Sequence, residues 1–394
     1  MIFIVGAVQF VNILDFMMVM PLGPDFAAAL GIPTSNLGLI GGSYTAAGCI
    51  AGLAGLLFLD RFGRRSALVV AMGGLAVGTA AGAFATDLTS LMIARIVAGA
   101  FGGPATSLAL SIITDVVPPA KRGQAMGAVM GAFSAASVLG VPLGLELARL
   151  WGWRAPFFVV AVLGIVITIV ARVLLPKLDG HLVDGGPPPK LDARRLRSMV
   201  ARPEVLLSAG LVAATNFSTF LFIPNISGLL QLNLGYPREH LGVLYLVGGG
   251  LSFFTMRLVG RLVDRFGSTA LVALSVAMFS VVVGLLGIVQ STLLPVLPLF
   301  ATFMIFQSTR NVSTQTLTSK VPRPDERAGF QSIQSAIQHG AGAAGAVTSS
   351  LMLHEVGGRL TGMPALAVLS IAAGCVGVPL VAALERRVRA GVSH

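Results

Sequence analysis

Polar residues inside long apolar runs are the first candidates for chemistry in this sequence. In the first run, Gln9, Asn12 and Asp15 follow one another at intervals of three, which keeps them on one side of a helix. A charge near the centre of a bilayer costs at least about 2.5 to 3.5 kcal/mol on insertion scales, so an ionisable group there is a functional candidate. Asp15 is the only acidic residue well inside an apolar run of the first half. It could exchange a proton, or remain paired with a cation and only hold helices together.

Two further polar stripes lie in the second half of the chain. One consists of Gln307, Arg310, Asn311 and Thr314, and the other of Gln331, Gln334, Ser335 and Gln338, with His339 beside it. A histidine can titrate near neutral pH, although a lone one beside glutamines is more often a hydrogen-bonded packing residue. The methionines after Asp15 could contact soft metals, but methionine more often fills apolar gaps. The spacing of histidine, cysteine and acidic residues predicts no metal site.

The composition indicates which elements must position these residues. Of 394 residues, 55% are hydrophobic and 11% are charged, with a mean hydropathy of +0.87, against about 25% charged residues in soluble domains. A helix that crosses a bilayer needs about 20 apolar residues. Runs of that length fall at about 2–24, 36–58, 66–86, 89–113, 124–147, 154–176, 204–229, 238–259, 269–290, 293–317, 329–353 and 362–385. We therefore expect an all-α membrane protein with twelve transmembrane helices, the first run being a span because it lacks the features of a signal peptide.

The positions of the basic residues predict the orientation of these helices. Short loops rich in Lys and Arg stay on the cytoplasmic side of a membrane. With the N-terminus inside, 21 of the 27 basic residues fall in cytoplasmic segments and four fall in outer loops, while Arg95 and Arg310 lie within spans. This asymmetry predicts that both termini are cytoplasmic and accounts for the net charge of +11 without a nucleic-acid partner.

An internal repeat divides the chain into halves. Leu59-Asp60-Arg61-Phe62-Gly63 recurs as Val263-Asp264-Arg265-Phe266-Gly267, and Val117-Pro118 recurs as Val321-Pro322, both at an offset of 204 residues. We expect an N-terminal six-helix bundle at 1–176, a cytoplasmic linker at 177–203 and a C-terminal six-helix bundle at 204–394. A substrate site at mid-membrane between two repeats is typical of secondary transporters.

The repeated loop carries a family resemblance. The stretch from Leu57 to Arg65 reads LFLDRFGRR and resembles the signature between spans two and three of the major facilitator superfamily, in which glycine permits a tight turn. The resemblance implies that this loop and its second copy form a cytoplasmic latch that stabilises the outward-open state. The latch residues are Asp60, Arg61, Gly63, Arg64, Arg65, Gly260, Asp264, Arg265 and Gly267.

Three other motifs extend the resemblance over nearly the whole chain. Arg95-Ile96-Val97-Ala98-Gly99 is similar to the fourth-span motif of the superfamily, and Trp153-Arg154-Ala155-Pro156-Phe157 is similar to its opening of span six. The fifth-span motif, Gly140, Pro142 and Gly144, is similar to that of drug:proton antiporters. In the superfamily, spans one, four, seven and ten line the central cavity, which implies that Asp15, Arg95, Asn216 and Arg310 surround one space. The candidate cavity residues are Asn12, Asp15, Arg95, Asn216, Gln307, Arg310, Asn311, Gln334, Gln338 and His339.

Together these patterns predict a secondary transporter. The sequence has no HExxH, GxSxG or Walker motif, so neither an intramembrane enzyme nor an ATP-driven pump is indicated, and no cofactor is expected. Paired repeats also argue against a channel or a receptor. The fifth-span motif and four aromatic residues, Phe217, Phe220, Phe222 and Phe306, favour proton-coupled efflux of a hydrophobic or amphipathic compound. We expect the protein to act as a monomer in the inner membrane. Uptake of a polar solute or metal chelate, by symport or facilitated transport, is the alternative.

Overall fold

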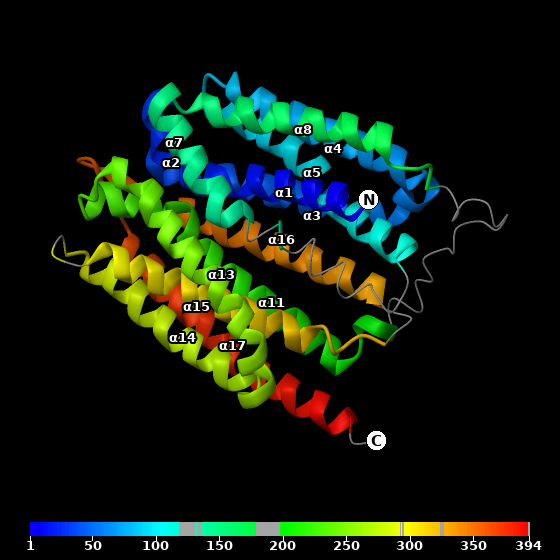
Figure 1. Ribbon diagram of the computed structural model, residues 1–394. Coiled ribbons are helices and arrows are strands. Elements are labelled where there is room, and N and C mark those ends of the chain that lie inside the picture. The colour runs from blue at the N-terminus through cyan, green and yellow to red at the C-terminus, as the bar shows by residue number, and fades with distance from the viewer. Residues whose placement is uncertain are drawn as a thin grey trace. The chain divides into compact units, whose positions relative to one another are not determined.

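The computed structural model of the protein is built almost entirely of helices, as Figure 1 shows. It describes residues 1–117, 131–132, 135–178, 198–291, 293, 295–323 and 327–392. Most of the expected linker, 177–203, and the first part of the expected fifth span, 124–147, lie outside the described residues.

The chain divides into two compact units, Met1–Ile32 with Ser43–Asp192, and Pro33–Gly42 with Ala193–His394. The described helices of the first unit are α1 (Ile2–Val19), α2 (Gly23–Leu30), α3 (Leu37–Phe58), α4 (Arg64–Ala83), α5 (Leu88–Val116), α7 (Val141–Trp151) and α8 (Arg154–Leu174). The start of α3 belongs to the second unit. Inside the first unit, α4 packs against both α5 and α8, and α1 packs against α5 and α8.

The second unit is also helical, with one small hairpin. Its helices are α11 (Pro203–Phe222), α12 (Ile226–Gly228), α13 (Leu241–Phe266), α14 (Ser268–Gly284), α15 (Val296–Thr318), α16 (Arg327–Met352) and α17 (Met363–Val392). Helix α11 packs against α16 and α17, and α15 packs against α13 and α14. Between α16 and α17, the strands β1 (His354–Val356) and β2 (Arg359–Thr361) pair antiparallel, with His354 opposite Thr361. The sequence did not predict this hairpin.

By length and composition, nine helices in the described part of the chain could cross a membrane. They correspond to the expected spans one to four, six to nine and twelve. Helices α15 and α16 match the expected tenth and eleventh spans in length, with 23 and 26 residues. They are not among the nine, because their polar stripes lower their hydropathy. The fifth expected span is described only in part, from its π-helical turn at Ala136–Gly140 into α7.

Side chains fix the ends of the helices that carry the candidate site. Asp87 caps α5, because its carboxylate accepts the backbone N–H of Ser90 at 2.7 Å. This hydrogen bond holds the pKa of the exposed Asp87 carboxyl below its usual value. Nearby, at the C-terminal end of α4, the Arg154 guanidinium donates to the carbonyls of Ala83 at 3.0 Å and Ala85 at 3.3 Å. The arginine of the expected sixth-span motif therefore joins the start of α8 to the end of α4.

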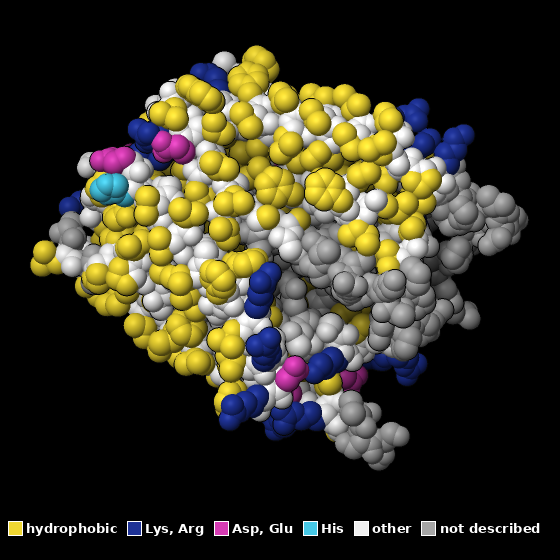
Figure 2. All heavy atoms as spheres, in the orientation of Figure 1, with side chains coloured by type: hydrophobic (Ala, Val, Ile, Leu, Met, Phe, Trp, Pro, Cys, Tyr) yellow, Lys and Arg dark blue, Asp and Glu magenta, His cyan; other side chains and the backbone are white. Residues whose placement is uncertain are grey.

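The outer surface has the apolar character of a membrane-facing protein. On α8, the buried side chains include Phe157, Ala161 and Ile167, whereas Val162 and Ile169 are exposed. Hydrophobic side chains cover most of the described surface in Figure 2, and Lys and Arg gather mainly toward its margins and lower part. A helix with apolar side chains on both its packed and exposed faces is suited to contact with lipid.

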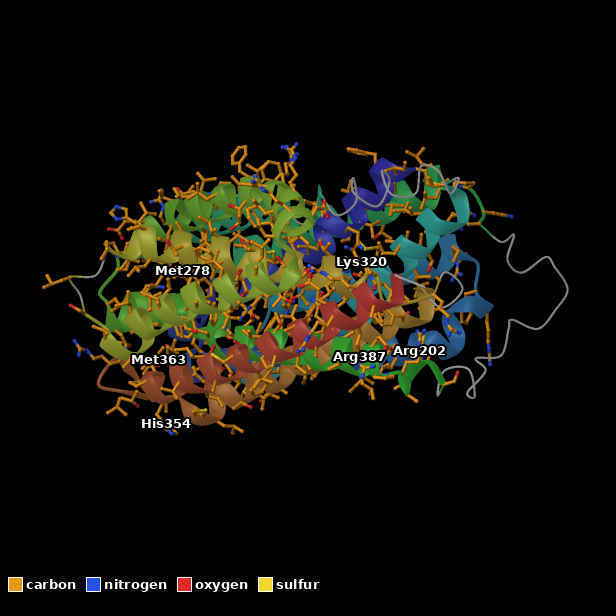
Figure 3. The ribbon with its side chains drawn as sticks, turned by 90° about the horizontal axis from the view of Figure 1, so that it is seen from below. Arg202, Met278, Lys320, His354, Met363 and Arg387 are labelled. Carbon is orange, nitrogen blue, oxygen red and sulfur yellow. The ribbon has the colours of Figure 1, made fainter. Side chains whose placement is uncertain are left out.

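The second unit has a basic end. In Figure 3, Arg202, Lys320 and Arg387 lie toward one end of its helices, and His354 and Met363 lie toward the opposite end. Arg202 precedes α11 and Lys320 follows α15, while Arg387 lies near the end of α17. Under the positive-inside rule, this end is the one expected to face the cytoplasm.

Candidate functional site

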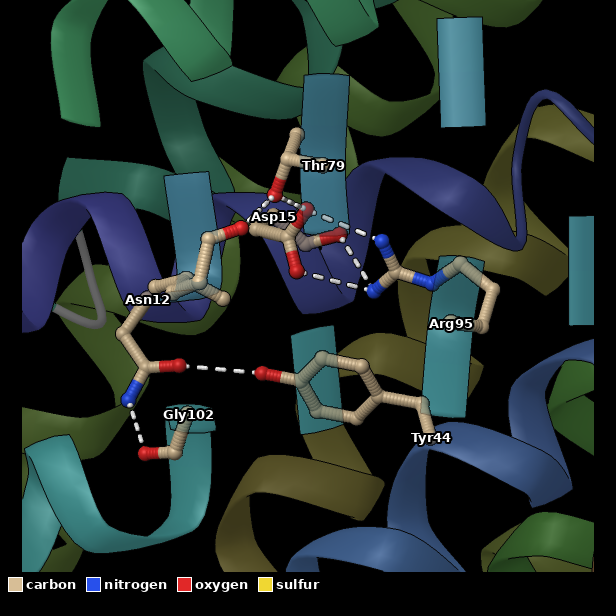
Figure 4. Close-up of polar contacts among 7 residues, drawn as sticks. Asn12, Asp15, Tyr44, Thr79, Arg95 and Gly102 are labelled. Atoms are coloured by element: carbon tan, nitrogen blue, oxygen red, sulfur yellow. Dashed lines mark hydrogen bonds and ion pairs between the residues drawn. The ribbon is translucent and has the colours of Figure 1, made fainter. Parts of the chain in front are cut away.

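A buried ion pair joins α1 to α5 in the first unit (Figure 4). The Arg95 guanidinium donates to both carboxylate oxygens of Asp15, with Nη1–Oδ1 at 2.9 Å and Nη2–Oδ2 at 2.8 Å. The side chains are 1% and 0% exposed. The Thr79 hydroxyl of α4 lies 2.7 Å from Asp15 Oδ1. Asp15 is therefore paired with a cation in this structure, and Thr79 is a third member that the sequence gave no signal for.

Tyr44 connects this pair to a second polar group on α1. The Arg95 guanidinium lies over the Tyr44 ring, 4.6 Å from its centroid, and the Tyr44 hydroxyl donates to Asn12 Oδ1 at 2.9 Å. Asn12 Nδ2 donates in turn to the carbonyl of Gly102 at 2.8 Å and to Thr106 Oγ1 at 2.6 Å. Figure 4 shows these side chains converging from α1, α3, α4 and α5. Tyr44 was not predicted, because a single tyrosine in an apolar run has no sequence signal that distinguishes it from a core residue.

Glycines on α5 make this convergence possible. A Cβ atom on Gly99 would lie 2.2 Å from the backbone oxygen of Tyr44. On Gly102 it would lie 2.5 Å from the Tyr44 hydroxyl and 2.8 Å from Asn12 Oδ1. Real Cβ atoms do not approach other atoms so closely, so α3 and α1 can pack here only against glycine. The glycine that ends the expected fourth-span motif thus brings Tyr44 close to α5.

The expected fifth-span motif packs against α1 beside the ion pair. Pro142 lies in the first turn of α7, directly after the π-helical turn that ends at Gly140. A Cβ atom on Gly140 would lie 2.5 Å from the Leu14 side chain, and one on Gly144 would lie 3.8 Å from Met18. The motif therefore borders the residue before Asp15, while Met18 is a buried packing residue. A role in export remains a prediction.

Arg310 forms the centre of a second polar cluster, inside the second unit. It is 1% exposed, and its Nη2 atom donates to Thr219 Oγ1 of α11 at 2.6 Å and to Gln307 Oε1 at 2.7 Å. Its Nη1 atom lies 3.5 Å from the Ser218 hydroxyl. The guanidinium also lies over the Phe279 ring of α14, 4.3 Å from the centroid. The cluster contains two predicted residues, Gln307 and Arg310, and three residues that were not predicted.

The other predicted cavity residues have varied surroundings. The amide of Asn216 donates to the carbonyl of Val212 on its own helix at 2.9 Å. Asn311 is half-buried and accepts from Gln315. On α16, Gln334 is buried against the Ser208 hydroxyl, Gln338 is exposed, and His339 Nδ1 lies 2.8 Å from the carbonyl of Ser335. His339 is therefore hydrogen-bonded to its own helix, as a packing histidine would be.

One aromatic residue expected to line a cavity is a core residue instead. Phe222 is fully buried, and its ring lies 6.0 Å from that of Phe303. A hydrophobic side chain gives no sequence signal that separates the two roles. Phe217, Phe220 and Phe306 are half-buried and therefore accessible in part.

The two copies of the loop assigned to the latch lie between α3 and α4 in the first unit and between α13 and α14 in the second unit. Arg65 donates to the carbonyl of Leu175 at 3.1 Å, beyond the end of α8. Arg61 and Arg265 are exposed, as is Asp264. Gly267 has a φ of +84°, and beside it the Glu385 carboxylate accepts the backbone N–H of Thr269 at 2.8 Å. Gly63 precedes α4, Arg64 begins it and Gly260 lies inside α13. The side chain of Asp60 is not among those the structure describes, so the latch remains a prediction.

The geometry thus provides one neutralised ion pair and one cationic cluster, in separate units. An acid and a base in contact can exchange partners when a proton or a ligand arrives, and an arginine can bind an anionic or polar group. No group of three or more His, Cys, Asp or Glu residues in the described chain could hold a metal ion. That Asp15, Arg95, Asn216 and Arg310 surround one space remains a prediction.

Known proteins with similar sequences include a resistance protein and a membrane transport protein. The chloramphenicol resistance protein of Streptomyces lividans is 29% identical over 246 residues, covering 62% of each chain. The inner membrane transport protein YdhP of Escherichia coli is 27% identical over 250 residues, again covering 62% of each chain. The alignments therefore span about three fifths of the length of these curated relatives.

Solved structures and a family model agree with this similarity. A bacterial homolog of the human lysosomal transporter Spinster, in an inward-facing and unoccupied conformation, has a TM-score of 0.72 at 15% identity, covering 98% of this chain and 96% of the other. The human organic anion transporter MFSD10 has a TM-score of 0.64 at 19% identity, covering 96% and 98%. At these identities the likeness shows the fold. The model of the Major Facilitator Superfamily matches residues 5–346, and the chain belongs to this superfamily of membrane transporters of small molecules.

Proposed function

We propose that the protein is a proton-coupled exporter of hydrophobic or amphipathic compounds that works by alternating access. The observation that carries this proposal is the buried pair of Asp15 and Arg95, with both carboxylate oxygens bonded to one guanidinium. Each charge of the pair is neutralised by the other only while the two side chains are in contact. Their separation would leave a buried carboxylate without a partner, which a proton could neutralise.

The structure around the pair suggests how such a change is transmitted. Asp15 lies on α1 one residue after Leu14, which contacts Gly140 in the fifth-span motif, and Arg95 lies on α5 under the Tyr44 ring of α3. A shift of α1 relative to α5 would lengthen the ion pair and alter the Tyr44 to Asn12 hydrogen bond together. We propose that a proton neutralises Asp15 when the pair separates and leaves when it forms again.

Two observations support export. The Streptomyces lividans relative is named for chloramphenicol resistance, and the aromatic side chains of Phe217, Phe220 and Phe306 remain partly accessible in the second unit. Aromatic and apolar linings bind varied hydrophobic ligands. We further propose that the protein acts as a monomer of two six-helix bundles in the inner membrane, with both termini and the 177–203 linker in the cytoplasm.

Transport by purified protein in liposomes tests the proposal. The liposomes contain protein in both orientations, and a pH gradient is imposed across their membrane. Protons that flow down this gradient should drive chloramphenicol or ethidium in the opposite direction. Asp15→Asn should retain ligand binding and lose the response to the pH gradient. Asp87→Asn is the matched control, because Asp87 is an exposed helix cap, and it should keep the response. Full gradient response in Asp15→Asn would remove Asp15 from the coupling role.

Uptake of a polar solute or metal chelate remains the second candidate, favoured by the half-buried amides of Asn216 and Asn311. These groups could bind hydroxyl or carboxylate groups of a polar ligand. The direction of coupling separates the two functions. Solute and protons moving in the same direction in the liposome assay would favour uptake, whereas opposite movement would favour export.

A further inference from the structure

We infer that the Arg310 cluster is a binding site for the anionic group, specifically a carboxylate, of a transported organic compound. The site consists of Arg310 on α15, Gln307 one turn before it, Ser218 and Thr219 on α11, and Phe279 on α14. It lies within one compact unit. The inference extends the proposed function by naming a chemical class of substrate.

The charge of Arg310 has no acidic partner among the residues that the structure describes. Its hydrogen-bond partners, Ser218, Thr219 and Gln307, are neutral, and its Nε atom is buried without an acceptor. The described acidic residues of this unit lie toward helix ends or in loops, at Glu204, Glu239, Asp264, Glu355 and Glu385. An uncompensated buried charge is costly, and natural proteins place such charges where they meet a partner.

The internal repeat shows which partner is missing. At the offset of 204 residues, Asn12 corresponds to Asn216, Asp15 to Thr219 and Phe16 to Phe220. In the first unit Asp15 neutralises Arg95, whereas in the second unit Thr219 occupies the corresponding position and contacts Arg310 through a neutral hydroxyl. The two arginines lie on different turns of α5 and α15, because Leu299 is the counterpart of Arg95. Each half thus has a buried arginine against the same position of its first helix, and only one of these positions carries a carboxylate.

Space around the guanidinium is kept by a glycine. A Cβ atom on Gly374 of α17 would lie 3.3 Å from Arg310 Nη1 and 3.2 Å from the Ser218 hydroxyl. Gln307 is half-buried and its amide bridges Arg310 and Thr219, with Nε2 to Thr219 Oγ1 at 2.9 Å. A carboxylate that displaces the Gln307 amide would replace a neutral acceptor by a charged one. Charge-assisted hydrogen bonds of this kind are about twice as strong as neutral ones.

The decisive variant is Thr219→Asp, which gives the second unit the carboxylate that the first unit has. We expect Thr219→Asp to raise the thermal midpoint by about 2 °C or more and to remove anion binding, because Arg310 is then neutralised. Thr219→Asn introduces a side chain of the same size as aspartate but without charge, so it should neither raise the thermal midpoint nor remove anion binding. If Thr219→Asp does not fold, Arg310→Gln provides the second readout, with loss of anion binding, and Arg310→Lys should retain part of it.

Calorimetric titration of the protein in nanodiscs measures binding. The probes are 2-naphthoate, neutral 2-naphthalenemethanol with the same rings, and sodium chloride. We expect the wild type to bind naphthoate about tenfold or more tightly than the alcohol, and Thr219→Asp or Arg310→Gln to lose that preference. Chloride binding that equals naphthoate binding and is abolished by the same variants would identify an inorganic anion site instead and overturn the substrate assignment.

The remaining outcomes are also decisive. Equal binding of naphthoate and the alcohol by the wild type, or an unchanged preference in Thr219→Asp and Arg310→Gln, would overturn the inference. Neither result depends on proton coupling or on export. Loss of the pH-gradient response in liposomes with intact naphthoate selectivity would bear on the proposed function alone.

Discussion

The backbone N–H of Thr34 donates a hydrogen bond of 2.7 Å to the carboxylate of Glu355, in the hairpin between α16 and α17. Nearby, the N–H of Leu39 donates to the Ser350 hydroxyl at 3.1 Å. A Cβ atom on Gly38 would lie 2.1 Å from the carbonyl of Ala346. Residues 33–42 are therefore fitted against α16 and its hairpin, with a carboxylate at the N-terminal end of the α3 region, where negative charge is stabilising. Glu355 is exposed, but it also fixes this segment.

Removing the Glu355 carboxylate should loosen the segment that contains Thr34. Ser35 is 6% exposed, so a Ser35→Cys reporter in a protein without Cys49 and Cys375 should react slowly with an impermeant thiol reagent. Adding Glu355→Ala should increase the rate several-fold, because the N–H of Thr34 loses a charged acceptor. Glu239→Ala, which removes an exposed acid of the same unit, is the control and should leave the rate unchanged. Equal rates with and without Glu355 would show that the hydrogen bond does not hold the segment.

Replacing Gly102 should disrupt the polar network through sterics alone. The added methyl group of Gly102→Ala would meet the Tyr44 hydroxyl and Asn12 Oδ1 at less than van der Waals distance. We expect a loss of about 1 to 3 kcal/mol in the free energy of unfolding and reduced transport. Gly73→Ala on α4 is the matched control, because a Cβ atom there has no neighbour within 4 Å, and it should be neutral or slightly stabilising. Similar effects of the two substitutions on thermal unfolding would exclude crowding as the cause.

The fold was predictable because its determinants are repeated and local. Apolar run lengths predicted the spans, and the repeat at Asp60 and Asp264 together with the loop motif predicted the superfamily, which the family match confirms. The β-hairpin and the attachment of residues 33–42 to the second unit were not predictable. They depend on contacts such as Thr34 to Glu355, which join positions 321 residues apart.

The candidate site was predictable where a charge or a polar stripe inside an apolar run marked it. Asp15, Arg95 and Arg310 were found because ionisable groups are rare in apolar runs. Tyr44, Thr79 and Phe279 complete the two clusters through contacts that only the packing of helices reveals. Thr219 did have a signal, since it occupies the position of Asp15 at the repeat offset.

The basic end of the second unit predicts which of its positions are reached from each side of the membrane. In a protein without native cysteines, Lys320→Cys should react with an impermeant reagent only after the cytoplasmic side is opened, and His354→Cys should react in intact cells. Both positions are exposed, so the reactivity reports the side rather than burial. Labelling of Lys320→Cys in intact cells would show that the orientation is reversed.

A double-mutant cycle on Asp15 and Arg95 measures the strength of the buried pair. Asp15→Ala leaves a buried guanidinium, and Arg95→Met leaves a buried carboxylate, so each single change should lower the free energy of unfolding by about 3 to 5 kcal/mol. The double variant should recover a large part of that loss, because no unpaired charge remains, with a coupling energy of about 2 kcal/mol or more. Chemical denaturation in mixed micelles provides the free energies, and liposome assays run in parallel should find no gradient-driven transport in any of the three variants. Additive losses in the cycle would mean that Asp15 and Arg95 act independently, and the proton-exchange scheme based on their contact would then have no energetic basis.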